Sequence, residues 1–271
     1  KQMFLGLMLP LMAVVGTWAC PEPVARDYTQ YVNPFIGTGG HGHVFLGANV
    51  PFGHIQAGPT QKKQGWDWCS GYHYSDSIII GFGQLHLSGT GIGDLGDIAL
   101  LPVTKSDVRE VKFSHKAEYA TPGYYAVTLA NGVRVELTAT QRTAFHRYTF
   151  PADARQEQVV VDLAQGVGWD KMTACTLQQE GQNTIVGSRF STGWAKDQRV
   201  FFVAEFSQPI THRTKEGDSL SVLSFEPTGQ PLMVKVGISS VSIDNARLNL
   251  QQESPGWNFK TMVSEAKFAW N

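Results

Sequence analysis

The chain has 271 residues, with 22 lysines and arginines against 23 aspartates and glutamates, and 42% of its residues are hydrophobic. This composition indicates a globular protein with enough apolar material for a core. It argues against a nucleic-acid partner, because nucleic-acid-binding proteins concentrate basic residues on one face and no basic run occurs here.

The first twenty residues, KQMFLGLMLPLMAVVGTWAC, have the pattern of an export signal. A basic residue precedes an apolar run from Met3 to Gly16, and small or polar residues then lead to Cys20. The apolar run is shorter than the roughly 20 residues needed to span a bilayer. A cysteine at this position is typical of a bacterial lipoprotein signal, so we predict an exported protein, periplasmic or at the cell surface, that is lipidated on Cys20. Contact with the membrane would be through this lipid anchor only. Plain secretion and a hydrophobic N-terminal strand or helix are the alternatives.

The two other cysteines, Cys69 and Cys175, do not form a disulfide framework. A bridge between them is possible in an oxidising compartment, although nothing in their spacing supports one. We favour two independent thiols, because unpaired cysteine is commonly buried as a small hydrophobic residue.

Glycines and histidines are concentrated in residues 31–60, YVNPFIGTGGHGHVFLGANVPFGHIQAGPT. The glycines lack the spacing of a dinucleotide-binding loop, and we expect them to permit close approach of the backbone to a ligand or to another chain segment. The spacing of His41, His43 and His54 matches neither a helical nor a finger-type ligand set, so we predict no metal site in this chain.

The next unusual stretch, GWDWCSGYHYSD at residues 65–76, places aromatic side chains around Asp67 and Asp76. Clustered aromatic rings with carboxylates between them suit sugar recognition, because a pyranose has an apolar face for a ring and hydroxyl groups that need fixed acceptors. The alternative is that these rings fill a core beneath a long loop.

The third stretch, GFGQLHLSGTGIGDLGDIALLP at residues 81–102, contains Asp94 and Asp97. Two carboxylates can serve as the acid and base of a glycosidase, but a pair on one loop has no fixed separation and an inverting pair needs about 6.5 to 9.5 Å. The stretch DLGD also lacks the ligand order of an EF-hand calcium loop. Aspartates that accept hydrogen bonds from turn backbone are the simpler interpretation.

From Ile98 onward, short apolar or alternating runs predict antiparallel strands: IALLPV, YYAVTLANGVRVELTAT, TAFHRYTF, QVVVDL, RVFFVAEF, SLSVLSFE and PLMVKVGIS. Asn131 and Gly132 predict a two-residue type I′ hairpin turn. Many strands without amphipathic helices between them favour an all-β antiparallel sandwich, because parallel strands need long crossover connections. One sandwich domain accounts for residues 28 to about 250.

The last segment changes its period. Within residues 255–271, apolar residues recur at helical spacing and predict an amphipathic helix. These residues are Phe259, Met262, Val263, Ala266 and Trp270. An apolar stripe of this kind must be buried, either against the sandwich or against a further domain.

Together, NPFIGTGGHGHVFLGANVPFG, GWDWCSGYHYSD and HLSGTGIGDLGDIALLP resemble the N-terminal domain of glycoside hydrolase family 92, a family of bacterial exo-acting α-mannosidases. The resemblance continues through FSHKAEYATPGYYAVTL to the terminal helix and covers nearly all of the chain after residue 20. This chain departs from the family pattern in two places. Gly83-Gln84-Leu85 precedes His86 where more polar residues are expected in relatives, and Leu46 stands where proline is usual.

The resemblance implies a β-sandwich (supersandwich), a linker helix that begins in residues 255–271, and a C-terminal α/α toroid outside this chain. It implies calcium-dependent, inverting hydrolysis of mannose-containing glycans at the interface between the domains, with the catalytic acid, the base and most calcium ligands in the C-terminal domain. In this chain, Trp66 would stack on mannose and Asp67 would accept hydroxyl hydrogens. His43, Cys69 and His86 are weaker candidates for lining the site, and Asp94 and Asp97 would order a loop.

Two other functions are compatible with the sequence. A free-standing carbohydrate-binding lipoprotein would need only an exposed aromatic platform. A self-contained enzyme would use Asp94, Asp97 and His86, and it requires two carboxyl groups that face a common substrate.

Overall fold

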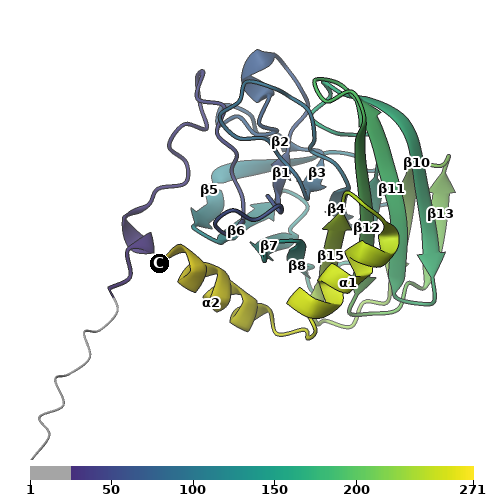
Figure 1. Ribbon diagram of the computed structural model, residues 1–271. Helices are drawn as coiled ribbons and strands as arrows, with labels where there is room; N and C mark the ends of the chain where they lie inside the picture. Colours follow the sequence, from purple (N-terminus) through teal and green to yellow (C-terminus); the bar gives the residue numbers. More distant parts are fainter. Residues whose placement is uncertain (1–25) are drawn as a thin grey trace, which may run out of the picture.

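The computed structural model describes residues 26–271 as two antiparallel β-sheets packed face to face, with two helices on the outer face of the larger sheet (Figure 1). The predicted all-β sandwich with a C-terminal helix is confirmed. The predicted export signal and Cys20 lie outside the described residues.

The smaller sheet has six strands in the order β1-β3-β4-β9-β14-β13. They are β1 (Gly58–Thr60), β3 (Gly81–Gly83), β4 (Ala99–Val103), β9 (Glu157–Asp162), β14 (Leu220–Phe225) and β13 (His212–Glu216).

The larger sheet has nine strands in the order β10-β11-β12-β15-β8-β7-β6-β5-β2. They are β10 (Lys171–Glu180), β11 (Thr184–Thr192), β12 (Gln198–Phe206), β15 (Leu232–Ser239), β8 (Thr143–Thr149), β7 (Arg134–Ala139), β6 (Tyr124–Leu129), β5 (Val111–Thr121) and β2 (Ile78–Ile79).

The main core lies between the two sheets. Val135, Leu137 and Val234 of the larger sheet share one buried cluster with Leu100 and Val160 of the smaller sheet. On the opposite face of the larger sheet, Val186 and Val203 pack under α1 and Phe145 packs under α2. Polar side chains on that face pair with one another, as Glu136 does with Tyr124 and Arg147, so β7 (RVELTA) still alternates between core-facing apolar residues and polar ones.

The hairpin between β6 and β7 corrects one detail of the sequence analysis. The Leu129 N–H donates to the Val133 carbonyl, so the loop contains the three residues 130–132 and not two. A type I′ turn needs positive φ at both central residues, and here only Gly132 adopts it, at 82°. The Asn131-Gly132 pair is equally compatible with a three-residue loop in which only the glycine adopts a left-handed φ.

The two helices begin at polar caps and pack on different parts of the larger sheet. In α1 (Ile243–Glu253), the Ser242 hydroxyl accepts from the Asn245 N–H, and Ala246 and Leu250 face β11 and β12. In α2 (Phe259–Trp270), the Asn258 side chain accepts from the Thr261 N–H. The buried residues of α2 are Phe259, Met262 and Ala266, three of the five predicted stripe positions.

Neither helix of the described part of the chain is long and apolar enough to cross a membrane. Cys69 is buried and Cys175 is half-buried, and within residues 26–271 they do not form a disulfide, as the sequence analysis favoured.

Candidate functional site

The glycine-rich segment forms a closed loop at one edge of the sandwich. The Val44 N–H donates to the Gly37 carbonyl, and the Gly42 N–H donates to the Gly39 carbonyl. A Cβ atom at Gly42 would lie 2.1 Å from the Gly37 carbonyl oxygen, so only glycine permits this closure. The tight loop projects His41 and His43 to the same side, and His43 itself adopts a left-handed φ of 56°.

A short 3₁₀ turn, η2 (Trp66–Trp68), supplies the facing side chains. The Cys69 N–H donates to the Trp66 carbonyl and the Gly71 N–H donates to the Trp68 carbonyl, which continues the turn beyond η2. The Trp68 indole N–H donates to Asp76 Oδ2, and its ring stacks on His73. Trp68 therefore anchors the turn, whereas Trp66 and Asp67 face outward.

Asp67 is the centre of the site. Its Oδ1 atom lies 2.7 Å from His41 Nδ1 and 2.9 Å from His43 Nε2, so two imidazoles contact the same carboxylate oxygen. Hydrogen bonds from His41 and His43 hold the pKa of Asp67 below its ordinary value. The carboxylate is therefore ionised at neutral pH and fixed in direction.

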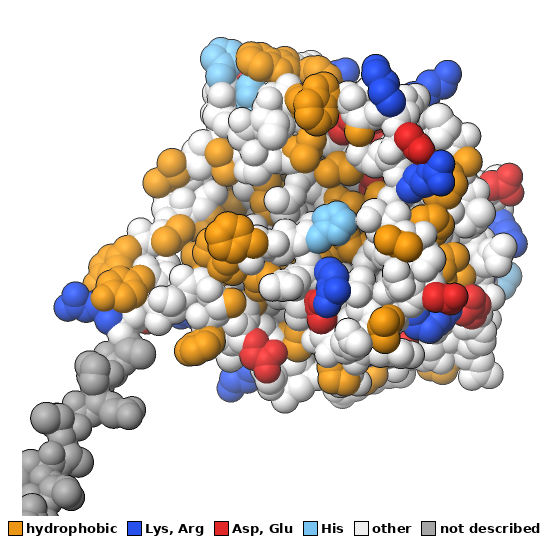
Figure 2. Space-filling model, in the orientation of Figure 1, with side chains coloured by type: hydrophobic (Ala, Val, Ile, Leu, Met, Phe, Trp, Pro, Cys, Tyr) orange, Lys and Arg blue, Asp and Glu red, His pale blue; other side chains and the backbone are white. Residues whose placement is uncertain are grey.

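Trp66 completes the cluster with an accessible aromatic face. Its ring centroid lies 4.3 Å from that of His43 in an edge-to-face arrangement, and its indole N–H donates to the Gly91 carbonyl. The residue is nevertheless 54% exposed. The space-filling view shows histidine and hydrophobic side chains side by side along one edge of the molecule (Figure 2). We refer to Trp66, Asp67, His41 and His43 as the loop cluster.

Two of the predicted site residues lie in the interior. Burial raises the pKa of the Cys69 thiol, and it leaves 1% of this residue accessible. His86 has no exposed surface: its Nδ1 N–H donates to the Gln56 carbonyl and its Nε2 accepts from the Thr60 hydroxyl. Burial lowers the pKa of His86 to about 4, which keeps the ring neutral. The expectation that Cys69 and His86 line the site is therefore corrected, because both support the loops from beneath.

Asp94 and Asp97 do not form a catalytic pair. Asp94 Oδ2 accepts from the Ala195 backbone N–H. Asp97 is fully buried, with Oδ1 at 2.8 Å from a guanidinium nitrogen of Arg189. One carboxylate orders a loop and the other is fully buried beside Arg189, so the self-contained mechanism that uses them with His86 lacks its geometry.

Sequence reasoning placed His41 in the glycine-rich segment but did not assign it to the site. Its contribution depends on how the loop between Gly37 and Val44 closes, and no residue spacing reveals that closure. His54, the third histidine of the segment, is exposed and its backbone N–H donates to the Gln141 carbonyl, away from the loop cluster.

The fold and the loop cluster define a two-sheet β-sandwich domain that presents an aromatic and polar site on its edge loops. Residues 31–239 match the N-terminal domain of glycosyl hydrolase family 92. The chain therefore belongs to glycosyl hydrolase family 92 and carries its N-terminal domain.

Solved structures and one curated protein share this similarity. A family GH92 α-mannosidase from Bacteroides thetaiotaomicron, solved in complex with mannoimidazole, superposes with a TM-score of 0.84 at 32% identity, over 90% of this chain and 36% of that chain. A family GH92 inverting mannosidase from the same organism gives a TM-score of 0.76 at 28% identity, over 90% and 36%. An uncharacterised secreted glycosidase of Arthroderma benhamiae is 27% identical over 290 residues, 90% of this chain and 37% of its own length. The chain thus spans little more than a third of the length of these relatives.

Proposed function

We propose that this chain is the substrate-site-contributing N-terminal domain of an inverting exo-α-mannosidase that acts on mannose-containing glycans. The support is its family membership and the relatives' descriptions, which name an α-mannosidase and an inverting mannosidase. Because the chain covers 36% of each of these structures, the catalytic acid and base would come from a further, C-terminal domain.

The observation that carries the proposal is the pairing of an exposed tryptophan with a fixed carboxylate. The accessible face of Trp66 would stack on the apolar face of mannose, and Asp67 would accept hydrogens from its hydroxyl groups. Asp67 Oδ1 already accepts from His41 and His43, whereas no hydrogen bond from the described residues reaches Oδ2. Asp67 Oδ2 is therefore held in a fixed direction and stays available to accept a hydrogen bond from a sugar hydroxyl group.

Calcium dependence, expected from the family resemblance, also belongs to this proposal. Calcium prefers six to eight oxygen ligands. The His41, His43 and Asp67 group offers two nitrogens and one carboxylate, which does not suit this ion. We therefore place the calcium ligands mostly outside this chain and assign no step of the reaction to calcium here.

The proposed place of action is outside the cytoplasm. One relative is described as a secreted glycosidase, which supports export. Lipid attachment at Cys20, periplasmic or at the cell surface, is part of the proposal and rests on the sequence pattern.

The decisive experiment measures mannose release from α-linked mannobiosides, with calcium and with a chelator, beside titration of mannose binding. The chain alone should release no mannose and bind it weakly. In the protein extended by its downstream reading frame, Trp66→Ala and Asp67→Asn should each lower kcat/KM by about tenfold to 100-fold, equal to roughly 1.4 to 2.8 kcal/mol. The matched surface controls Trp194→Ala and Asp197→Asn should leave it unchanged.

Two outcomes would redirect the proposal. Calcium-dependent release by this chain alone would contradict the half-site assignment and return attention to Asp94 and Asp97. Tight mannose binding without release would favour the free-standing carbohydrate-binding module, for which the exposure of Trp66 is the supporting observation.

A further inference from the structure

The loop cluster gathers three potential metal ligands that sequence spacing does not associate. His41 Nδ1, His43 Nε2 and a carboxylate oxygen of Asp67 all lie within 4.8 Å of one another. The two imidazoles come from one closed loop and the carboxylate from η2, 24 or more residues away. Spacing rules for helical and finger-type sites do not apply to such a loop, which is why the sequence analysis predicted no metal ligands.

The separations fit a small transition ion after a modest adjustment. A tetrahedral zinc site with ligand bonds of about 2.0 to 2.2 Å places its ligand atoms about 3.3 to 3.5 Å apart. The corresponding nitrogen-to-oxygen distances here are 2.7 and 2.9 Å. Each imidazole would retreat by less than about 1 Å from the carboxylate, which is within the reach of side-chain rotation.

The surroundings hold two ligands firmly and leave the third able to adjust. The His43 side chain is 8% exposed, its backbone is in the left-handed region, and its ring packs on Trp66. Asp67 is fixed by the hydrogen-bonded turn that contains η2. His41 is 80% exposed, so it can turn to meet an ion while the solvent side stays open for water as a fourth ligand.

We propose that His41, His43 and Asp67 form a binding site for Zn²⁺ or a similar divalent transition ion. Two neutral imidazoles and one carboxylate suit such ions, whereas calcium prefers oxygen ligands alone. The inference goes beyond the proposed function, because it concerns an ion and not a sugar. One consequence does depend on that function: an ion on Asp67 would engage the carboxylate that we assign to mannose, and it would inhibit sugar binding.

The test is a titration of the purified, chelator-treated chain with Zn²⁺, by calorimetry and by competition with a chromophoric chelator. About one ion should bind per chain at this site. The His41→Ala and Asp67→Asn variants should each weaken this binding by about tenfold or more. His212→Ala, which removes an exposed histidine of β13, should leave it unchanged. Ca²⁺ should not compete for the site.

A second readout reports the ligand set directly. Co²⁺ bound in place of Zn²⁺ should give visible absorption typical of four-coordinate nitrogen and oxygen ligation, and His41→Ala should reduce it. Because His41 is exposed, its removal should leave the circular dichroism spectrum intact. The absence of Zn²⁺ binding, or binding that both His41→Ala and Asp67→Asn leave unchanged, would overturn the proposal. Neither result depends on mannosidase activity, so this proposal and the proposed function can fail separately.

Discussion

A buried charge cluster behind the loops is the clearest feature at the scale of single residues. The Arg189 guanidinium bonds both oxygens of Asp170, lies 2.8 Å from Asp97, and donates through Nε to the Leu163 carbonyl. Asp97 is close to Arg189 but poorly aligned with it, and neither of its oxygens has a hydrogen-bond partner among the described residues. Burial, opposed by Arg189, raises the pKa of Asp97 to about 7.

This raised pKa predicts a loss of stability as the pH increases. An ordinary aspartate has a pKa of about 3.9, so between about pH 4 and pH 7 the folded state keeps a proton that the unfolded state releases. The contribution of Asp97 to stability is therefore greatest below about pH 4. It falls as the pH rises and is lost above the pKa of about 7 in the folded state. Urea unfolding at pH 5 and pH 8 should show this fall in the native chain and a smaller one in Asp97→Asn. Equal pH dependence in the two proteins would contradict the assignment.

At the scale of elements, Lys235 of β15 joins α1 to the larger sheet. Its buried ammonium group donates to the Ser254 carbonyl at the end of α1, lies over the Trp257 ring, and is 3.3 Å from Glu205. The carbonyls of the last helical turn have no partners within the helix. Lys235 supplies one such partner from the neighbouring strand.

Replacing this lysine should loosen α1. Lys235→Met keeps much of the apolar stem but leaves the Ser254 carbonyl and Glu205 without their cation, which should lower the free energy of unfolding by about 1 to 3 kcal/mol. Lys260→Met, at an exposed position of α2, is the matched control and should have little effect. Denaturant unfolding compares the three proteins, and equal midpoints and slopes would show that Lys235 is not needed there.

The elements differ in how far the sequence reveals them. The strands that the apolar or alternating runs predicted, such as β7 and β15, are almost fully buried, and the apolar residues that face the core mark them in the sequence. In contrast, β5 is interrupted by a register shift between Phe113 and Glu118, and most residues of β10 are not buried. Helix α1 buries only Ala246, Asn249 and Leu250, too few apolar positions to show a helical period.

The loop cluster shows a similar division. Trp66 and Asp67 could be selected because aromatic and acidic residues alternate in one short stretch. His41 could not, because its place depends on loop closure, and His86 was misassigned because a buried histidine and a site histidine look alike in sequence. Its partners, the Gln56 carbonyl and the Thr60 hydroxyl, are 30 and 26 residues away.

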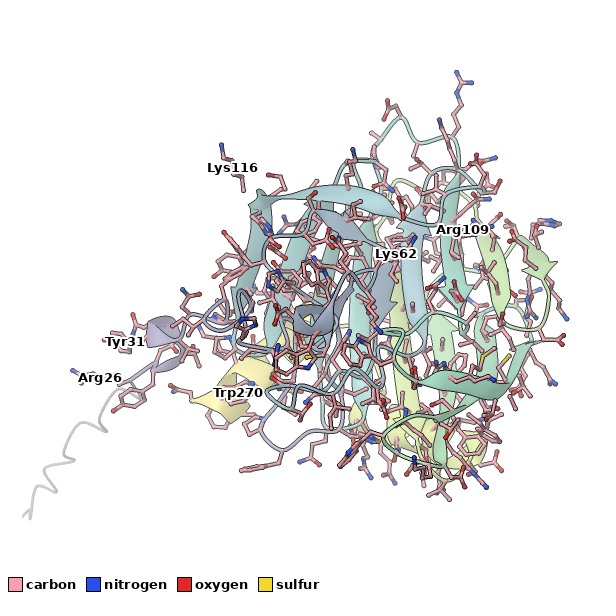
Figure 3. The ribbon with its side chains drawn as sticks, turned by 90° about the horizontal axis from the view of Figure 1, so that it is seen from above. Arg26, Tyr31, Lys62, Arg109, Lys116 and Trp270 are labelled. Carbon is pink, nitrogen blue, oxygen red and sulfur yellow. The ribbon has the colours of Figure 1, made fainter. Side chains whose placement is uncertain are left out.

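At the scale of the whole molecule, α2 is joined to the first described residues. Lys267 pairs with Asp27 and the Tyr28 N–H donates to the Asn271 side chain, while the Trp270 indole N–H donates to the Asn49 carbonyl. Trp270 also borders a cavity of about 310 Å³ that Tyr28, Val32 and Phe45 line. Arg26, Tyr31 and Trp270 lie on the same side of the molecule, away from Arg109 (Figure 3).

These contacts predict that the first described residues and the end of α2 open together. Trp270→Phe retains an aromatic ring over the cavity but removes the donor to Asn49, which weakens the contact by about 0.5 to 1.5 kcal/mol and increases the open population about two- to tenfold. Amide hydrogen exchange should accelerate in residues 28–32 and 266–270, while exchange in β7 and β15 stays at its native rate. Trp194→Phe, at an exposed tryptophan for which no hydrogen bond is seen in the described residues, serves as the control. Faster exchange in only one of the two segments would show that they are not coupled through Trp270, which borders the same cavity as Tyr28 and Val32.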